Sequence, residues 1–280
     1  MATRIVRDPR RAGRSAGGLV PAATAALLLL GGCGTTPAGT ASGGTAPTGT
    51  ATGGQTAPGA PAPARIPQAT TFGTVSGAPR DASSDGATDG LVVHPERAVP
   101  VFDRPGGRPV ATLPTEQLGA PTWVPVVESS GGWRRVLLPS RPNGSSGWIP
   151  GDGLRAAHTP YTVRVDLAHR RLTLFRSAKE TGRWTVAIGG AKTPTPPGRT
   201  FLMATLAPAK RTPSPIVLPL GTHSATLDTF GGGPGTVALH GWPDASVFGK
   251  AVTHGCVRVP EDALRALSRV PLGSLVFITG

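Results

Sequence analysis

The sequence predicts a mainly β protein, with a small β-barrel followed by a mostly β sheet domain that contains one or two short helices. Short apolar runs alternate with turn-forming residues over residues 91–158 and again over 161–280. The 280 residues include 40 Gly and 31 Pro, which punctuate structure and make a single 280-residue domain a poor interpretation. One helix is expected after Pro260, where Glu261 and Asp262 fall in the first turn and the apolar face is Ala263, Leu264 and Leu267.

The small barrel is expected over residues 91–158, where Asn143-Gly144 and similar pairs are typical of hairpin turns. The segments Gly132-Trp133-Arg134-Arg135-Val136 and Gly147-Trp148-Ile149 resemble those of bacterial SH3-like domains, which often accompany cell-wall enzymes. The resemblance implies an SH3-like β domain in this part of the chain.

Residues 1–32 have the pattern of a secretion signal, with a basic start and an apolar run over residues 19–30 that is too short to span a bilayer. The segment Leu30-Gly31-Gly32-Cys33 resembles a bacterial lipobox, in which the cysteine is lipidated and becomes the mature amino terminus. The resemblance implies a lipoprotein anchored to the outer face of the cytoplasmic membrane through Cys33 and facing the cell wall. A plain cleaved signal is the alternative.

Residues 33–90 are predicted to be a disordered linker rich in Gly, Pro, Thr and Ala. Residues 34–64 contain no charged residue and no large apolar side chain, so they bury too little surface to offset their ordering entropy. Such a linker is long enough to hold a catalytic unit well above the membrane.

The net charge of +13 suits an exported protein that works in an anionic cell envelope. Nucleic acid is the other usual partner of a basic chain. We expect no nucleic-acid partner, because the chain carries an export signal and no Lys/Arg cluster follows residue 32.

The strongest chemical signal is His240-Gly241 followed by His254-Gly255-Cys256-Val257-Arg258. A thiol is a weak nucleophile at its free pKa, so catalysis needs an imidazole to take its proton or to pair with the thiolate. Of the 2 cysteines, Cys256 alone keeps a free thiol if Cys33 carries lipid. Both nearby histidines precede Cys256 and none follows it, which disfavours papain-like enzymes.

Residues 253–258, Thr-His-Gly-Cys-Val-Arg, resemble the active-site motif of L,D-transpeptidases with a YkuD-like catalytic domain. Residues 189–198 resemble the Thr-Pro-Thr-Pro-x-Gly segment of the same family, and the resemblance extends over residues 160–280. It implies that Cys256 is the nucleophile, that His240 accepts and returns the proton, and that His254 shapes the site. From the residues alone His254 stays an alternative base, since it would lie two positions from Cys256 on one extended strand.

Other residues of the motifs have expected roles at the substrate. The amides of Gly255 and Cys256 are candidates for an oxyanion hole. Arg258 is a candidate clamp for a carboxylate of the donor peptide. The remaining candidates for substrate binding are Gly241, Trp242 and Thr253.

The resemblance implies ping-pong acyl transfer that cross-links peptidoglycan through a thioester on Cys256, with stem peptides as donor and acceptor and with carbapenems as inhibitors. No cofactor is expected, and no metal, because the His-x-Cys spacing is unlike common zinc motifs. The alternatives are an L,D-carboxypeptidase, a transferase that attaches a protein to the wall, and an inactive peptidoglycan-binding lipoprotein.

Overall fold

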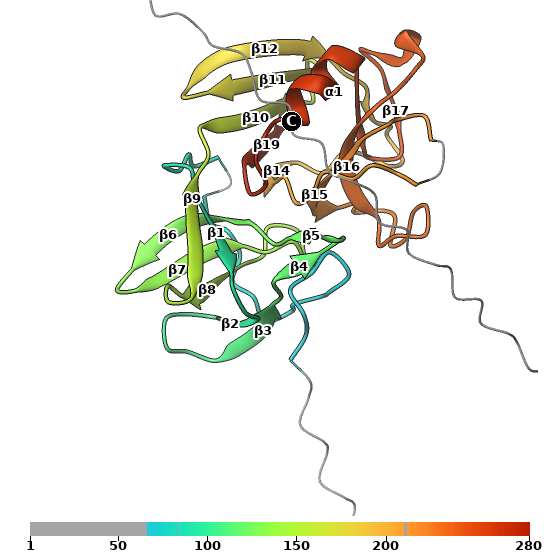
Figure 1. Ribbon diagram of the computed structural model, residues 1–280. Coiled ribbons are helices and arrows are strands. Elements are labelled where there is room, and N and C mark those ends of the chain that lie inside the picture. Colours follow the sequence, from blue (N-terminus) through green and yellow to red (C-terminus); the bar gives the residue numbers. More distant parts are fainter. Residues whose placement is uncertain (1–65, 84, 210–211) are drawn as a thin grey trace, which may run out of the picture. The chain divides into compact units, whose positions relative to one another are not determined.

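The computed structural model describes residues 66–83, 85–209 and 212–280, and it confirms a mainly β protein (Figure 1). The predicted signal (1–32), the predicted lipidation site Cys33 and residues 34–65 of the predicted linker lie outside the described residues. Among the described residues, every helix is too short or too polar to cross a membrane.

The first sheet has seven antiparallel strands in the order β3-β2-β8-β7-β6-β1-β9. Its strands, in chain order, are β1 (Leu91–Pro95), β2 (Val99–Phe102), β3 (Pro109–Leu113), β6 (Val124–Ser130), β7 (Trp133–Leu137), β8 (Ser146–Pro150) and β9 (Leu154–His158). A separate two-stranded hairpin joins β4 (Glu116–Gln117) to β5 (Ala120–Pro121). The SH3-like character of this region stays a prediction.

The segment before β1 packs against this first sheet. Ala69 and Val75 are fully buried in the same hydrophobic cluster as the strands. Their backbone N–H groups donate to Thr112 O and Arg141 O, both at 2.8 Å. The predicted linker over 33–90 therefore extends too far at its carboxyl-terminal end, because a few small apolar side chains suffice to anchor residues that composition alone marks as polar and turn-rich.

The second region contains two main sheets. One has the order β12-β11-β10-β19-β14, in which only the β10–β19 pair is parallel. Its strands are β10 (Tyr161–Asp166), β11 (Arg171–Arg176), β12 (Lys179–Thr185), β14 (Gly198–Phe201) and β19 (Leu275–Thr279). The other has the order β15-β16-β18, with β15 (Val217–His223), β16 (Thr236–Gly241) and β18 (Val257–Val259). A short parallel pair joins β13 (Ile188–Gly189) to β17 (Ala251–Thr253).

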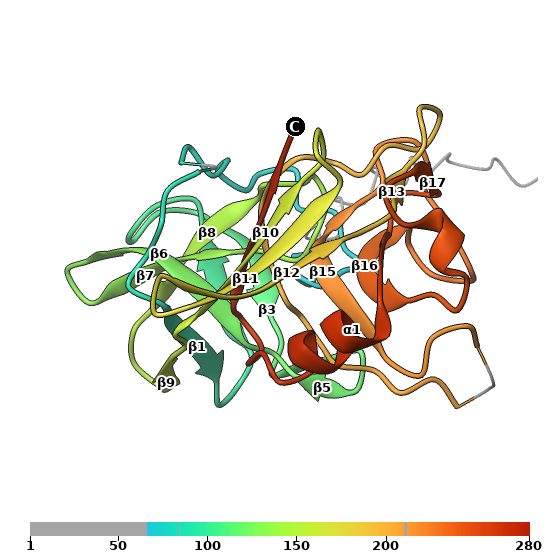
Figure 2. The same cartoon turned by 90° about the horizontal axis from the view of Figure 1, so that it is seen from above.

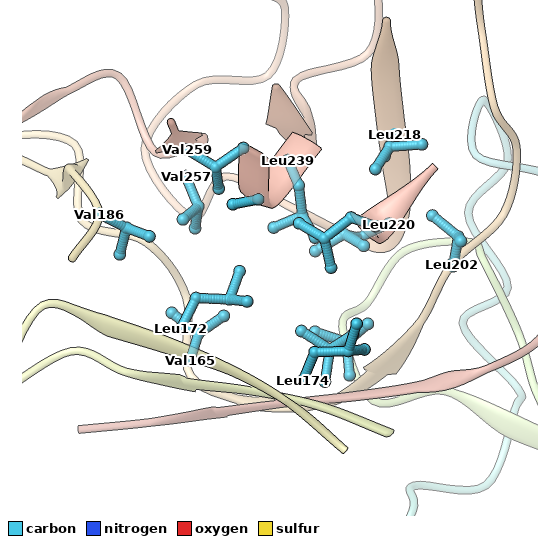
Figure 3. Close-up of a cluster of buried hydrophobic side chains, with 14 of the residues drawn as sticks. Val165, Leu172, Leu174, Val186, Leu202, Leu218, Leu220, Leu239, Val257 and Val259 are labelled. Carbon is cyan, nitrogen blue, oxygen red and sulfur yellow. The ribbon is translucent and has the colours of Figure 1, made fainter. Parts of the chain in front are cut away.

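A hydrophobic core fills the space between these two sheets (Figure 3). Leu172 and Leu174 point into it from β11, and Leu239, Val257 and Val259 face them from β16 and β18. Alternate residues of a strand point to opposite faces. The apolar residues of β16 and β18 thus determine which side chains of these strands point away from the core.

The helix α1 (Glu261–Leu267) begins where the sequence predicts it, directly after the N-cap residue Pro260. Its buried residues are the predicted ones, Ala263, Leu264 and Leu267. The helix packs against β12 and β16 (Figure 2). A single 3-10 turn, η1 (Ala245–Val247), lies in the loop between β16 and β17.

Candidate active site

The candidate catalytic side chains share one face of the parallel β16–β18 pair. Leu239 is aligned with Val257 and His240 with Arg258 in the register. Because Leu239 and Val257 point into the core, His240 and Arg258 point to the opposite face. Cys256 directly precedes β18 and its thiol contacts the backbone of Ala238, which lies two residues before His240. The sheet therefore brings His240 together with Cys256 and Arg258, which lie in a later segment of the chain.

The thiol of Cys256 is held in its neutral form. Burial raises the pKa of the Cys256 thiol above its usual 9.0, although a hydrogen bond with the Ala238 backbone and the charge of Arg258 both lower it. Desolvation disfavours the thiolate more than these two contacts favour it. Activation of Cys256 at neutral pH therefore requires a base that removes the proton during the reaction.

The ring of His240 has the protonation state that such a base needs. Its Nδ1 lies 2.9 Å from Gly241 O, and because a carbonyl only accepts, Nδ1 carries the hydrogen. Burial lowers the pKa of His240 below its usual 6.5, the bond to Gly241 raises it, and the charge of Arg258 lowers it again. The ring is thus neutral at pH 7, and its Nε2 is a free proton acceptor. Among the described residues no hydrogen bond joins Cys256 Sγ to either imidazole, and such contacts often tighten only when substrate binds.

The residues between β17 and β18 form a tight turn. The prediction that His254 and Cys256 share one extended strand is wrong, because β17 ends at Thr253, β18 begins at Val257, and Gly255 has a φ of +114°. L side chains rarely adopt this φ, so Gly255 is required by the backbone. This turn changes the direction in which His254 points.

The hydroxyl of Thr253 closes this turn. Thr253 Oγ1 accepts from the Gly255 N–H at 3.1 Å and donates to Cys256 O at 2.6 Å. Thr253 is buried, and its hydroxyl has a structural role inside the turn, while its role in substrate binding stays a prediction. The Gly255 N–H is already engaged, which removes it from the predicted oxyanion hole and leaves the Cys256 N–H as the candidate donor of this turn.

His254 lies at the surface of the protein. Its side chain is exposed, and its ring lies 5.2 Å from the ring of Phe230, centroid to centroid. Phe230 is itself 50% exposed. The predicted neighbour of Cys256 is therefore a surface residue, and no sequence pattern indicates its pairing with Phe230.

Arg258 and Trp242 form a stacked pair. The Arg258 Cζ lies 3.6 Å from the centroid of the Trp242 ring, and that ring lies 6.1 Å from the ring of His240 in an edge-on orientation. A guanidinium stacked on an indole keeps its charge and its planar set of donors while its orientation is fixed. Arg258 Nε is buried and has no hydrogen-bond partner among the described residues. The pair can therefore present a fixed cation beside His240 and Cys256.

Gly241, which follows His240 in the sequence, is held in place by Ser214. Its N–H donates to Ser214 Oγ at 2.7 Å, and Ser214 Oγ donates to Ile216 O. A Cβ at Gly241 would lie only 3.1 Å from Leu264 of α1. Gly241 is thus buried against the helix. Its predicted place at the substrate stays a prediction, and Ser214 is a supporting residue that sequence reasoning missed.

Within the described residues there is no cluster of three or more His, Cys, Asp or Glu side chains that could bind a metal ion. The site contains one thiol, one neutral imidazole and one guanidinium. This set suits proton transfer to and from a thiol and the binding of an anionic group.

Comparison with known proteins gives two sequence matches. Residues 160–278 match the family model YkuD, described as the L,D-transpeptidase catalytic domain. A candidate L,D-transpeptidase YkuD of Bacillus licheniformis is 33% identical over 129 residues, which covers 45% of this chain and 71% of the relative.

Solved structures resemble the chain more weakly. An L,D-transpeptidase from Mycobacterium smegmatis is 14% identical with a TM-score of 0.36, and the match covers 56% of this chain and 99% of that one. The catalytic domain of an E. faecium L,D-transpeptidase is 18% identical with a TM-score of 0.35, covering 44% of this chain and 100% of that one. The assignment to a family rests on the sequence matches.

Proposed function

The chain belongs to the YkuD family of L,D-transpeptidases, and we propose that it cross-links peptidoglycan through a thioester on Cys256. The observation that carries the proposal is the register of β16 and β18, which puts His240 and Arg258 on one face beside Cys256. A thiol, a neutral imidazole and a cation on one face are the groups that acyl transfer from a carboxylate-bearing peptide requires.

In the first half-reaction, His240 Nε2 takes the thiol proton while Cys256 Sγ attacks the carbonyl that joins a diamino acid to the terminal D-residue of the donor stem. The S–C bond forms, the carbonyl oxygen becomes negative, and the Cys256 N–H is the candidate donor that stabilises it. The C–N bond then breaks, and the amine of the D-residue leaves with the proton from His240. The product of this step is the thioester.

In the second half-reaction, an amine of another stem peptide attacks the thioester. His240 takes a proton from this amine and returns it to the leaving thiolate, so that the enzyme is regenerated without any external reactant. Water in place of the amine gives hydrolysis, which would make the protein a carboxypeptidase.

Arg258 is proposed to bind a carboxylate of the donor peptide. Its stacking on Trp242 fixes the plane of the guanidinium, and a planar fork suits a carboxylate better than a mobile ammonium does. The charge also lowers the pKa of His240 and of Cys256, so the same residue couples substrate binding to the state of both groups.

The location and the inhibitors are part of the same proposal. A lipid on Cys33 would anchor the chain outside the cytoplasmic membrane, where its substrate lies. Carbapenems would acylate Cys256, because their strained amide mimics the donor carbonyl. Loss of labelling by radioactive palmitate in Cys33→Ala is the expected result for the anchor, and unchanged labelling would contradict it.

The test of the activity is intact-mass analysis of the full chain and of its products after incubation with a disaccharide-tetrapeptide. A dimer that has lost one terminal D-residue, formed by the wild type and absent with Cys256→Ala, is the expected result. Release of the D-residue without a dimer would assign hydrolysis instead. Absence of both products, together with failure of a carbapenem to add to the wild type, would overturn the proposal.

A further inference from the structure

The loop that follows β13 is bound tightly to the turn that carries Cys256. Gly190 N–H and Thr193 Oγ1 both donate to Thr253 O, at 3.0 and 2.9 Å. Thr195 Oγ1 donates to Gly255 O at 2.8 Å and accepts from the Gly189 N–H at 2.9 Å. The loop thus contacts the turn through carbonyl oxygens on both sides of His254.

Thr195 is built into the protein as an internal residue. It is only 3% exposed, and both hydrogen-bonding capacities of its hydroxyl are used within the buried region. Gly189 is also constrained, since a Cβ there would lie 2.3 Å from Thr193 O and 2.4 Å from Thr195 N. The Thr195 hydroxyl thus bridges Gly189 and Gly255.

The hydrogen bond from Thr195 Oγ1 to Gly255 O also restricts the orientation of the Cys256 N–H. Gly255 O and the Cys256 N–H belong to one planar trans peptide group, so they point in opposite directions. Holding Gly255 O toward Thr195 therefore fixes the direction of the Cys256 N–H. The neighbouring Gly255 N–H is held separately by Thr253 Oγ1, so the Cys256 N–H is the donor that remains to be aimed.

We propose that Thr195 is a positioning residue that aims the Cys256 N–H at the oxyanion of the acyl-transfer reaction. The inference rests on the proposed function, in which Cys256 is the nucleophile. It assigns Thr195 no contact with substrate: the hydroxyl acts only through the Gly255–Cys256 peptide group.

Two reactions of the Cys256 thiol distinguish a role of Thr195 in positioning the Cys256 N–H from a general role in holding the structure together. A carbapenem reacts by attack of Cys256 Sγ on the lactam carbonyl, which places negative charge on the oxygen before the ring C–N bond breaks and the nitrogen takes the proton. Iodoacetamide reacts by displacement of iodide and forms no oxyanion. A poorly aimed N–H slows the first reaction only, whereas a displaced thiol or an unfolded site slows both.

The variants are Thr195→Val, which keeps the shape of the side chain without its hydroxyl, and Thr195→Ser, which keeps the hydroxyl. Thr200→Val is the matched control, because Thr200 on β14 is also 3% exposed and its Oγ1 has no hydrogen-bond partner among the described residues. All are made in the full chain with Cys33→Ala, so that Cys256 is the single thiol of the sequence. Thermal unfolding establishes that each variant is folded at the assay temperature.

We expect Thr195→Val to slow carbapenem acylation about 10- to 100-fold while iodoacetamide alkylation stays within about twofold of the parent. Thr195→Ser and Thr200→Val should keep most of the acylation rate. The inference is overturned if Thr195→Val acylates at the parental rate, if both reactions fall together, or if Thr195→Ser loses as much as Thr195→Val.

Failure of the proposed function gives a different result. Carbapenem addition that persists in Cys256→Ala, or an absence of addition to the parent while iodoacetamide still labels Cys256, would reject the nucleophile itself. The role of Thr195 would then be rejected with it, whatever its variants do.

Discussion

The two faces of the β16–β18 pair differ completely in composition. Leu239, Val257 and Val259 on one face are buried in the core, while the other face carries His240 and Arg258 beside Cys256. Since side chains alternate along a strand, a shift of one residue would exchange the faces, burying the charged groups and exposing the apolar ones. The core face thus fixes the register on which the chemistry of the other face depends.

Replacing Cys256 by alanine should abolish catalysis on the polar face, the face that carries His240 and Arg258, and should leave the packing of the core face intact. We expect Cys256→Ala to lower transpeptidation at least about a thousandfold, because no other group of the site can form the thioester. Product analysis by mass spectrometry measures the activity, and urea unfolding should give a stability close to that of the wild type. Dimer formation by this variant would contradict the assignment.

Substitutions of the two histidines should have very different effects on activity. His240→Ala should lower kcat about 100- to 10,000-fold, because it removes the buried base. His254→Ala is the matched control and should stay within about fivefold of the wild type, since its exposed ring lies against Phe230. Steady-state kinetics on the donor peptide measure both, and the reverse order of effects would identify His254 as the base.

The packing of the core face can be tested by measuring the free energy of unfolding of core variants. Leu239→Ala should lower the free energy of unfolding by about 2–5 kcal/mol, because Leu239 is enclosed by the core and its removal leaves a cavity. Val252→Ala on β17, where the side chain is 49% exposed, should change it by less than about 0.5 kcal/mol. Urea denaturation of both variants provides the measurement. Equal effects would mean that the core is not formed as described.

Substitutions at Arg258 test whether the polar face binds the carboxylate of the donor peptide. Arg258→Met should lower kcat/KM about 10- to 100-fold for a donor with a free carboxylate, because a charge-assisted contact is lost. Arg258→Lys should fall between the two, since an ammonium lacks the planar stack on Trp242. A donor with an amidated carboxylate should react equally with Arg258→Met and the wild type. A large difference on that donor would instead point to an effect on His240 or Cys256.

The pH dependence is the smallest expected effect. The reaction needs His240 neutral, and burial holds its pKa below 6.5, so kcat/KM should rise with pH through that lowered pKa and be level by about pH 7. The raised pKa of Cys256 keeps the thiol largely protonated over this pH range. In Arg258→Met the acid limb should move to higher pH, because a nearby positive charge no longer opposes protonation of His240. A pH–rate profile of both proteins checks this, and an acid limb above pH 6.5 in the wild type would exclude the neutral resting base.

Local patterns predicted the β character of the described residues and the helix α1. Apolar runs over 91–158 and 161–280 predicted the mainly β character of both regions, and the proline followed by acidic residues identified α1. Shorter strands such as β13, β17 and β18 gave no comparable signal, because two or three residues carry too little periodicity. The linker prediction was wrong for the segment that contains Ala69 and Val75 for a related reason, since both residues gain their burial only from distant strands.

The sequence by itself determined the candidate groups: one thiol, two histidines, a glycine and an arginine in a family motif. Only the tertiary structure decided their geometry. It placed the exposed ring of His254 against Phe230, used the hydroxyl of Thr253 inside the turn, and placed Thr195 against Gly255 across 60 residues of chain. The physical reason is that residue types and short periodicities are local, whereas a hydrogen bond between distant segments exists only after the core has set the register of the strands that carry them.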